Sequence, residues 1–209
     1  NTVVSELHYH PSDPTAGEIT AGFIDSDLFE FIELQNISPT NYIELQNCHF
    51  DTGITYTFTA STQLAPGGRI VIPRRTAAFL LRHPGVSTAP QYYIAATPTG
   101  NQFSNGGEEI SLVDAAGHDI KRFVYDDVAP WPTTPDGLGK ALALISPNSN
   151  PNHADPLSWR ASLADDGTPG STDGIAFTGS ASADANNNGI PDLTDFAIGS
   201  GEIPSAVLV

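Results

Sequence analysis

Short strand-like runs alternate with turn signals along most of this chain of 209 residues, and this alternation restricts the fold more than any other feature. The runs are rich in Val, Ile, Thr, Phe and Tyr, and Gly, Pro, Asn and Asp residues stand between them. They occupy residues 3–9, 29–36, 42–50, 54–60, 69–73, 108–114, 119–125, 140–145 and 158–162. Many short strands separated by turns predict an all-β fold.

The run at residues 29–36 can be placed within its sheet. Phe29 and Phe31 lie on one face of an extended chain, whereas Ile32 and Leu34 lie on the other. A strand that is apolar on both faces is usually a central strand. We therefore expect this run to have a neighbouring strand on each side.

One helix and one hairpin are expected between the strands. Residues 76–82 have the apolar spacing of a helix, with Thr76 expected as its cap and His83-Pro84-Gly85 as its stop. The turn at residues 115–118 contains a Gly between two strand-like runs, which predicts a β-hairpin. The helix is expected to lie outside the sheets.

Acidic residues outnumber basic ones: 24 Asp and Glu stand against 8 Lys and Arg, so the formal net charge is −16. Nucleic-acid backbones are bound by clustered Lys and Arg, and we therefore expect no nucleic-acid partner. Arg69, Arg74, Arg75 and Arg82 are close in sequence, and we expect them to form a solvated cover around one loop and the short helix. Cys48 is the single cysteine, which excludes an internal disulfide.

The sequence contains no Met, no secretory signal and no apolar run long enough to span a membrane. We interpret the chain as a piece of a longer protein. Its acidic, Lys-poor composition, together with the calcium-type ligands described below, is typical of an exported bacterial protein. We therefore expect a secreted or cell-surface location.

The composition changes towards the C-terminus. From Asp165 the residues are small, polar and rich in Gly and Ser, as in a linker or a domain edge. We expect one domain over residues 1–170, a linker over 171–183 and a separate segment over 184–209. The last segment includes DLTDFAIG, which predicts a short helix.

The run DANNNGIPDLTD, at residues 184–195, has the spacing of a twelve-residue calcium loop. Oxygen ligands at alternate positions converge on one ion, and the Gly at the sixth position permits the sharp turn. The predicted ligands are Asp184, Asn186, Asn188, the Ile190 carbonyl, Asp192 and Asp195. Asp in place of the usual Glu at the last position is expected either to weaken the site or to let it accept a smaller ion. One structural calcium ion is the prediction, and an acidic turn that binds no metal is the alternative.

Six segments between residues 2 and 170 occur in a characteristic order: VVSELHYHP, EFIELQN, LAPGGRIVI, SNGGEEISLVDAAGHDIKRFVYDD, APWP with DGLGKALALI, and DPLSWRASLADDGTPG. In this order they resemble the lamin-tail domain family, whose fold is an immunoglobulin-like β-sandwich. The bacterial branch, often joined to exported enzymes or surface proteins, is the closer likeness. The C-terminal run resembles the calcium loops of thrombospondin type 3 and dockerin-like segments.

One residue departs from the family pattern. Cys48 stands where the family commonly has a core Trp. We interpret Cys48 as a small buried residue, and a reactive thiol is the alternative.

The resemblance implies a non-catalytic module that docks onto other proteins or spaces other domains. Nuclear lamin tails are associated with DNA and partner proteins, but the acidic composition argues against DNA here. We therefore expect an interaction or spacer module of an exported or cell-surface multidomain bacterial protein, with a structural calcium site and a protein or cell-surface partner. Its expected fold is all-β, an immunoglobulin-like β-sandwich with a short C-terminal calcium-loop segment.

Two other functions stay open. A hydrolase acting through paired carboxylates would use acids from the set Glu30, Glu33, Asp126, Asp127 and Asp136. The sequence has no GxSxG motif and no Cys–His pair at a recognisable spacing.

A carbohydrate-binding accessory module would use Trp131, Tyr92 and Tyr93 as stacking surfaces. The alternative for Trp131 is a lid on one end of the sandwich. The prolines on both sides of Trp131 favour the lid, because they fix a loop against a core.

Further metal sites are also conceivable. Glu6, His8 and His10 lie two residues apart and share one strand face, as ligands of a transition metal would. A second calcium site would combine Asp126 and Asp127 with Glu6 or Glu30. The other histidines are expected at the surface; they are His49, His83, His118 and His153.

Overall fold

The computed structural model describes residues 1–93 and 100–173. Their strands are β1 (Thr2–His8), β2 (Phe31–Asn36), β3 (Ile43–Glu44), β4 (His49–Thr52), β5 (Tyr56–Thr57), β6 (Gln63–Leu64), β7 (Arg69–Pro73), β8 (Glu108–Val113), β9 (Asp119–Tyr125), β10 (Leu142–Leu144) and β11 (Trp159–Ala161). Their helices are α1 (Ala16–Thr20) and α2 (Thr76–Arg82), with 3₁₀ helices η1 (Ser26–Phe29), η2 (Pro147–Ser149) and η3 (Pro156–Ser158).

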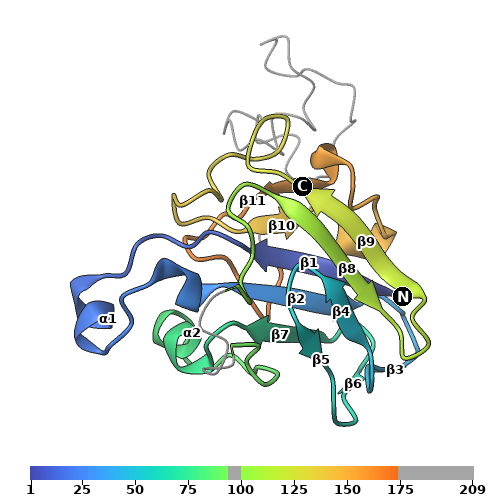
Figure 1. Ribbon diagram of the computed structural model, residues 1–209. Helices are drawn as coiled ribbons and strands as arrows, with labels where there is room; N and C mark the ends of the chain where they lie inside the picture. The colour runs from blue at the N-terminus through green and yellow to red at the C-terminus, as the bar shows by residue number, and fades with distance from the viewer. Residues whose placement is uncertain (94–99, 174–209) are drawn as a thin grey trace.

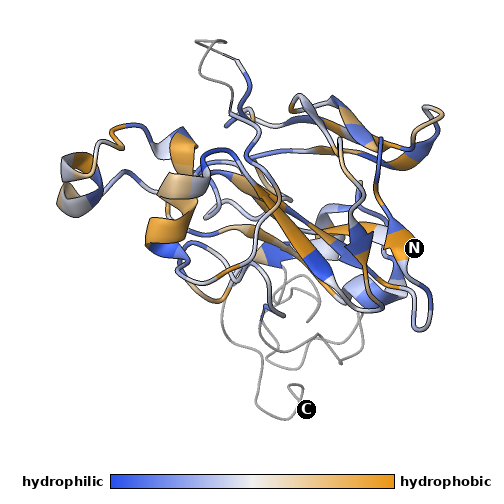
Figure 2. Ribbon diagram, turned by 90° about the horizontal axis from the view of Figure 1, so that it is seen from below, coloured by the Kyte–Doolittle hydropathy of each residue, from blue (hydrophilic) through white to orange (hydrophobic). Residues whose placement is uncertain are grey.

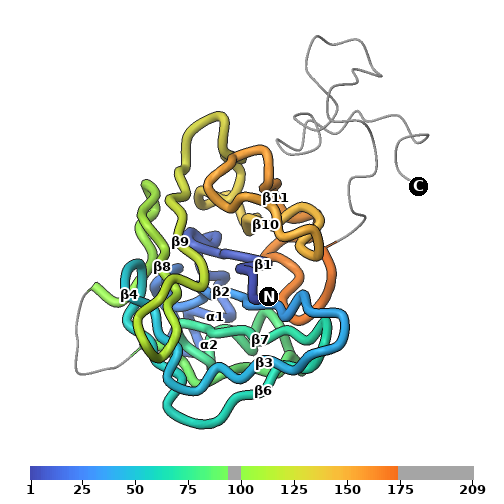
Figure 3. Tube along the Cα trace, turned by 90° about the vertical axis from the view of Figure 1, so that its right-hand side faces the viewer, coloured from blue at the N-terminus to red at the C-terminus, as the bar shows by residue number. Residues whose placement is uncertain are grey.

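The strands form antiparallel sheets in two layers. The five-stranded sheet has the order β11-β10-β1-β2-β7, the four-stranded sheet has the order β5-β4-β8-β9, and β3 pairs with β6. Figure 1 shows β8 and β9 crossing in front of β1 and β2, and the end-on view of Figure 3 shows β4, β8 and β9 along one side. The predicted all-β fold is confirmed, and the arrangement is consistent with an immunoglobulin-like sandwich.

The main core lies between the two layers. Ile32 and Leu34 of β2 face it, together with Ile110 and Leu112 of β8. β2 pairs with β1 on one side and β7 on the other, so the predicted central strand is confirmed. Phe31 points to the opposite, outer face of the five-stranded sheet, as strand alternation requires.

Helix α2 covers part of this outer face. Phe79 of α2 is fully buried against Phe31 and Val71, which form a second, smaller apolar cluster. Figure 2 shows α2 as a largely apolar helix beside α1. The predicted helix is confirmed outside the sandwich, but its cap is not Thr76. Arg75 occupies the N-cap position, and its side chain makes no capping hydrogen bond. The Gln91 side chain instead accepts from the backbone N–H of Thr76, in the first turn, at 3.2 Å.

Helix α1 was not expected from the sequence. It begins after Thr15, whose Oγ1 accepts from the backbone N–H of Glu18 at 3.3 Å. The Glu18 carboxylate in turn accepts from the backbone N–H of Thr15 at 2.7 Å, which completes a capping box. Gly17 is a weak helix former within a helix of only five residues, so apolar periodicity gives no signal there.

A β-bulge in β1 determines which of its side chains lie on the outer face. Val4 pairs with Leu34 and Glu6 pairs with Glu33, so β1 advances by two residues while β2 advances by one. Ser5 is the extra residue, and both Ser5 and Glu6 therefore lie beside Glu33. Without this bulge, strand alternation would turn one of the two away from Glu33.

Residues 162–173, which we call the closing segment, follow β11 and pack onto the outer face. The backbone N–H of Thr168 donates to Glu6 at 2.8 Å, and that of Gly170 donates to Glu33 at 2.5 Å. Composition from Asp165 left a linker or a domain edge open, and these contacts show that Thr168 and Gly170 pack against the sandwich. Small polar residues are needed there because the segment lies directly on two buried strands.

Candidate functional site

The predicted calcium loop at residues 184–195 lies outside the described residues. Among residues 1–93 and 100–173, no group of three or more His, Cys, Asp or Glu side chains is arranged to hold a metal ion. The suggested trio of Glu6, His8 and His10 is not brought together: Nδ1 of His10 lies 2.6 Å from Oδ1 of Asp136 instead. The alternative calcium group of Asp126 and Asp127 with Glu6 or Glu30 is not formed either.

Charged and polar side chains gather on the outer face of the five-stranded sheet, and the first group surrounds Glu33. This carboxylate accepts from Ser5 Oγ at 2.6 Å and forms an ion pair with Arg69. Burial raises the pKa of Glu33, and the opposing effect of Arg69 does not cancel this. The pKa of Glu6 is raised well above its usual value, first by burial and then by the neighbouring Glu33 carboxylate.

The closing segment seals these two carboxyl groups. Gly167 has φ +82° and is so close to Glu6 that a Cβ there would overlap its Oε1. A side chain at Gly167 is thus excluded both by conformation and by space. The backbone of the closing segment shields Glu6 and Glu33 from solvent, which indicates that these carboxyl groups have a structural role.

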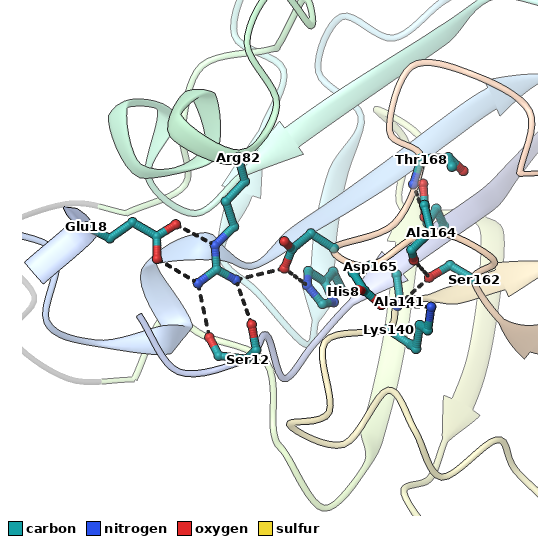
Figure 4. A network of polar contacts seen from close by, with 12 residues as sticks. His8, Ser12, Glu18, Arg82, Lys140, Ala141, Ser162, Ala164, Asp165 and Thr168 are labelled. Carbon is teal, nitrogen blue, oxygen red and sulfur yellow. Dashed lines mark hydrogen bonds and ion pairs between the residues drawn. The ribbon is translucent and has the colours of Figure 1, made fainter. Parts of the chain in front are cut away.

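A second group is centred on Arg82, at the end of α2. Its guanidinium donates to Glu18 of α1 and to Asp166 of the closing segment, each at 2.8 Å, and to the Ser12 carbonyl at 3.1 Å. Figure 4 shows the Arg82 guanidinium with Glu18 on one side, His8 on the other side and Ser12 below it. The guanidinium also lies 3.9 Å from the ring centroid of Phe29. This single side chain joins α1, α2, the loop that follows β1 and the closing segment.

The expected solvated cover of arginines is therefore wrong in part. The Arg82 and Arg74 side chains are only 7% and 6% exposed. Arg74 donates to Gln102 at 3.0 Å and lies 3.4 Å from Asp27. Local sequence gave no sign of these acidic and polar partners, which come from distant segments.

Glu30, another acid suggested for catalysis, is fully buried at the start of β2. Its Oε2 accepts from the Tyr92 hydroxyl at 2.7 Å and from the Phe103 N–H at 3.2 Å. Burial raises the pKa of Glu30 well above its usual value, although the Tyr92 hydrogen bond acts in the other direction. Glu30 thus holds the segments around Tyr92 and Phe103 to β2.

Two of the remaining suggested acids have hydrogen-bond partners of their own. Asp126 accepts from the backbone N–H groups of Asp127 and Val128, at 2.8 and 3.2 Å. Asp136 contacts His10 as described above. Glu30 and Glu33 belong to separate hydrogen-bond networks, so the structure does not assemble them as a carboxylate pair.

The rings suggested for carbohydrate stacking are mostly in the core. Trp131 is 7% exposed and packs near Trp159, with ring centroids 6.3 Å apart. Tyr92 is 1% exposed, and Tyr93 lies under the guanidinium groups of Arg74 and Arg75. The interpretation of Trp131 as a lid is confirmed, and its use as an open stacking platform is wrong.

Of the histidines expected at the surface, His153 is buried and His83 is half-buried. His153 is 4% exposed, and its ring nitrogens lie 3.0 Å from the Pro151 carbonyl and 3.2 Å from the Val4 carbonyl. Burial lowers the pKa of His153 to about 4. Burial also lowers the pKa of His83 to about 4, beside Phe79. His118 is exposed, as expected.

The His8 imidazole and the Cys48 thiol are also buried. Burial lowers the pKa of His8, whose Nε2 lies 3.8 Å from Oδ1 of Asp166, too far for a hydrogen bond. Cys48 is part of the main core, and burial raises the pKa of its thiol. The interpretation of Cys48 as a small buried residue is confirmed.

The sequence interpretation missed the partners that organise this face: Glu18, Asp166 and Thr168. A signal for Glu18 was present, since Thr15 and Glu18 have the spacing of a capping box. Nothing in the local sequence marks Asp166 and Thr168, because their partners lie in β1 and α2.

The model of one protein family, described as Lamin Tail Domain, matches residues 1–127, which is more than half of the chain. The match includes β1 to β9 and ends before Trp131 and the closing segment. No curated protein and no solved structure matches the chain. None of the helices in the described part has the length and apolar composition needed to cross a membrane.

Proposed function

Because the chain belongs to the lamin tail domain family, whose members are generally non-catalytic, we propose that it is an interaction or spacer module. The module is part of an exported or cell-surface multidomain bacterial protein, and its partner is a protein or another cell-surface component. The net charge of −16 supports this assignment over nucleic-acid binding, since anionic backbones are repelled by such a surface.

One observation carries this proposal: the buried acidic side chains hold distant segments of the chain together. Glu6, Glu30 and Glu33 are each at most 2% exposed. Each accepts hydrogen bonds from a segment distant in the chain, as Glu6 does from Thr168. A general acid or base must reach substrate, whereas these carboxyl groups are enclosed by the protein itself.

The test is a turnover assay on glycosides, esters and peptides, with the wild type and the Glu30→Gln and Glu33→Gln variants. No turnover that depends on either carboxyl group is expected. Asp13→Asn, at an exposed position, is the matched control. Reproducible turnover that one Glu→Gln substitution abolishes, with Asp13→Asn unaffected, would establish an enzyme instead.

The second part of the proposal is a structural calcium ion held at residues 184–195. The support is the ligand spacing of Asp184, Asn186, Asn188, the Ile190 carbonyl, Asp192 and Asp195. Clustered carboxylates repel one another, and a cation relieves that repulsion. An ion bound by the folded form alone adds about 2.7 kcal/mol of stability at a hundredfold excess over its dissociation constant.

Isothermal titration of metal-stripped protein with calcium tests this part. We expect one ion per chain, and binding should disappear in the Asp184→Ala, Asp192→Ala double variant. An Asp13→Ala variant should bind like the wild type. Failure of the stripped wild type to bind calcium at millimolar concentration would reduce the loop to an acidic turn.

A further inference from the structure

The outer edges of the two main sheets are protected in different ways. The edge of β7 is covered, since Ala89 N–H donates to the Val71 carbonyl at 2.8 Å. β11 is fastened by the ion pair of Arg160 with Asp173 of the closing segment. β9 carries charged residues, including Arg122, which pairs with Glu109 at 2.6 Å. Covering a strand and placing charges along it are the usual means of preventing unwanted strand pairing.

The edge of β5 has no charged side chain. Residues 54–60 read Ile-Thr-Tyr-Thr-Phe-Thr-Ala. β5 pairs with β4 on one side and is the outermost strand of the four-stranded sheet. An uncharged, threonine-rich edge in a chain of net charge −16 is the arrangement expected of a strand that accepts another strand.

The backbone of β5 alternates between β4 and the outer edge. Phe58 N–H donates to the Cys48 carbonyl at 3.0 Å, and the Phe58 carbonyl accepts from Asn47 N–H at 2.7 Å. In an antiparallel pair the next residue directs its N–H and carbonyl away from the partner strand. The N–H and carbonyl of Thr57 therefore point to the outer edge.

A side-chain amide already occupies the position of an added strand at one place on this edge. Oδ1 of Asn101 accepts from Thr55 N–H at 2.6 Å, and its Nδ2 donates to the Thr55 carbonyl at 3.1 Å. Asn101 Nδ2 also donates to the Tyr92 carbonyl at 2.6 Å, which holds the amide in place. Thr57 is the next outward-facing residue, so a peptide would continue the pairing that Asn101 begins.

A groove lies beside this edge. It has a volume of about 340 Å³ and is lined by Thr55, Tyr56, Thr57, Phe58, Thr59, Ala60, Thr62, Pro90, Gln91 and Tyr92. No lining residue is charged. Tyr56 and Phe58 belong to the main core, and the rest of the lining is Thr, Ala, Pro, Gln and Tyr side chains, so an uncharged peptide would meet no charge there.

We propose that the β5 edge binds an extended peptide segment of a partner protein by strand addition, with Thr57 as the paired residue. This inference rests on the proposed interaction function and gives it a surface. The segment is uncharged where it pairs, as the groove is. It carries a basic residue near Thr62, where the Glu44 carboxylate accepts from Thr62 N–H and Ser61 Oγ, both at 2.7 Å.

The probe is a fluorescein-labelled peptide of sequence KVTVTIK, added to the full chain and followed by fluorescence anisotropy. We expect saturable binding. The same peptide with alternate backbone nitrogens methylated should bind at least tenfold more weakly, because the methyl groups remove the N–H donors that pair with β5. The peptide EVTVTIE should also bind more weakly, because its charges repel an acidic chain.

Two variants locate the binding on β5. Thr57→Pro removes the outward N–H, and proline is tolerated on an edge strand when that N–H faces away from the sheet. Thr57→Val changes the side chain and keeps the N–H. We expect Thr57→Pro to lose binding and Thr57→Val to keep it. If Thr57→Pro does not fold, the methylated peptide on the unmodified chain decides the question.

Several outcomes overturn the inference. They are absence of binding at millimolar peptide, equal binding of the methylated peptide, and equal binding by a folded Thr57→Pro variant. Dimerisation that Thr57→Pro abolishes would assign the edge to a second copy of the chain. Slow hydrogen exchange at Thr57 N–H in the free monomer would show that the chain covers its own edge. These results concern peptide binding and not catalysis. Each of them would therefore still be compatible with a non-catalytic spacer module.

Discussion

Nε of Arg82 in α2 donates to Oε1 of Glu18 in α1 at 2.8 Å, which joins the two short helices through a nearly buried ion pair. The residues are 64 positions apart in the chain. Neither helix is long enough to be stable alone, because helices of one or two turns do not persist in water. The Arg82 contact therefore contributes to the stability of both helices by holding α1 against α2.

Replacing Arg82 by Met should destabilise the protein strongly. The substitution leaves the Glu18 and Asp166 carboxylates without their shared partner, and breaking a buried ion pair in this way costs about 3 kcal/mol. Arg122→Met is the matched control. Arg122 also pairs with carboxylates, but it is 38% exposed, and its loss should cost about 1 kcal/mol or less.

Urea unfolding of the two variants measures the difference in free energy of unfolding. Equal losses for Arg82→Met and Arg122→Met would mean that the Arg82 network contributes no more than a surface ion pair.

Gly167→Ala should be more harmful than a substitution at another glycine of the same conformation. Gly167 and Gly117 have φ of +82° and +84°, so an alanine is strained at both, by about 1 kcal/mol. At Gly117 a Cβ would meet nothing within 4 Å, whereas at Gly167 it would overlap Glu6. Thermal unfolding of both variants separates conformational strain from the overlap.

A double variant identifies the contact at Gly167. Glu6→Ala removes the atom that the new Cβ would meet, so it should reduce the cost of Gly167→Ala. If the two substitutions were simply additive, the close approach of Gly167 to Glu6 would not limit the closing segment.

The thiol of Cys48 should react slowly in the native protein. Burial in the main core limits access, and the raised pKa reduces the thiolate fraction. A colorimetric thiol reagent should modify Cys48 rapidly only after denaturant is added. Rapid modification of the folded chain would restore the alternative of a reactive thiol.

Two imidazoles should titrate far below the usual range. His83 and His153 have pKa values lowered to about 4 from 6.5, so the unfolded chain binds more protons between these values. These two residues therefore lower the stability as the pH falls from about 6.5 to 4. Histidine ring signals in NMR spectra recorded from pH 7 to 3 measure both values. Titration of the His153 ring near pH 6.5 would show that it is open to water.

Strand positions and the central place of β2 were predictable because they depend on local alternation. Phe31 and Ile32 are adjacent, and their opposite burial follows from strand geometry alone. The lid role of Trp131 followed from its flanking prolines.

The outer face was not predictable in the same way. The bulge at Ser5 has no local signal, yet it decides that Ser5 and Glu6 both lie beside Glu33. The closing segment resembles a linker in composition, and only its contact with Glu6, through Thr168, shows that it is packed. Such features depend on pairings between residues far apart in sequence.

The structural role of the buried carboxyl groups is tested most directly by the pH dependence of stability in Glu6→Gln. The pKa of Glu6 is raised in the folded chain above the usual 4.5 by burial and by Glu33, so the folded state binds this proton more tightly. The resulting stability is fully present below the unfolded pKa and is lost as the pH rises through the folded pKa.

The measurement is the free energy of unfolding of the wild type, Glu6→Gln and the exposed control Asp13→Asn at several values from pH 3 to 8. Gln keeps an oxygen to accept from Thr168 N–H and carries no charge. We therefore expect Glu6→Gln to gain stability relative to the wild type as the pH rises, while Asp13→Asn does not. A Glu6→Gln variant that becomes less stable than the wild type towards neutral pH would show that the folded protein requires the ionised carboxylate, and would contradict the account in which burial favours the protonated form of Glu6.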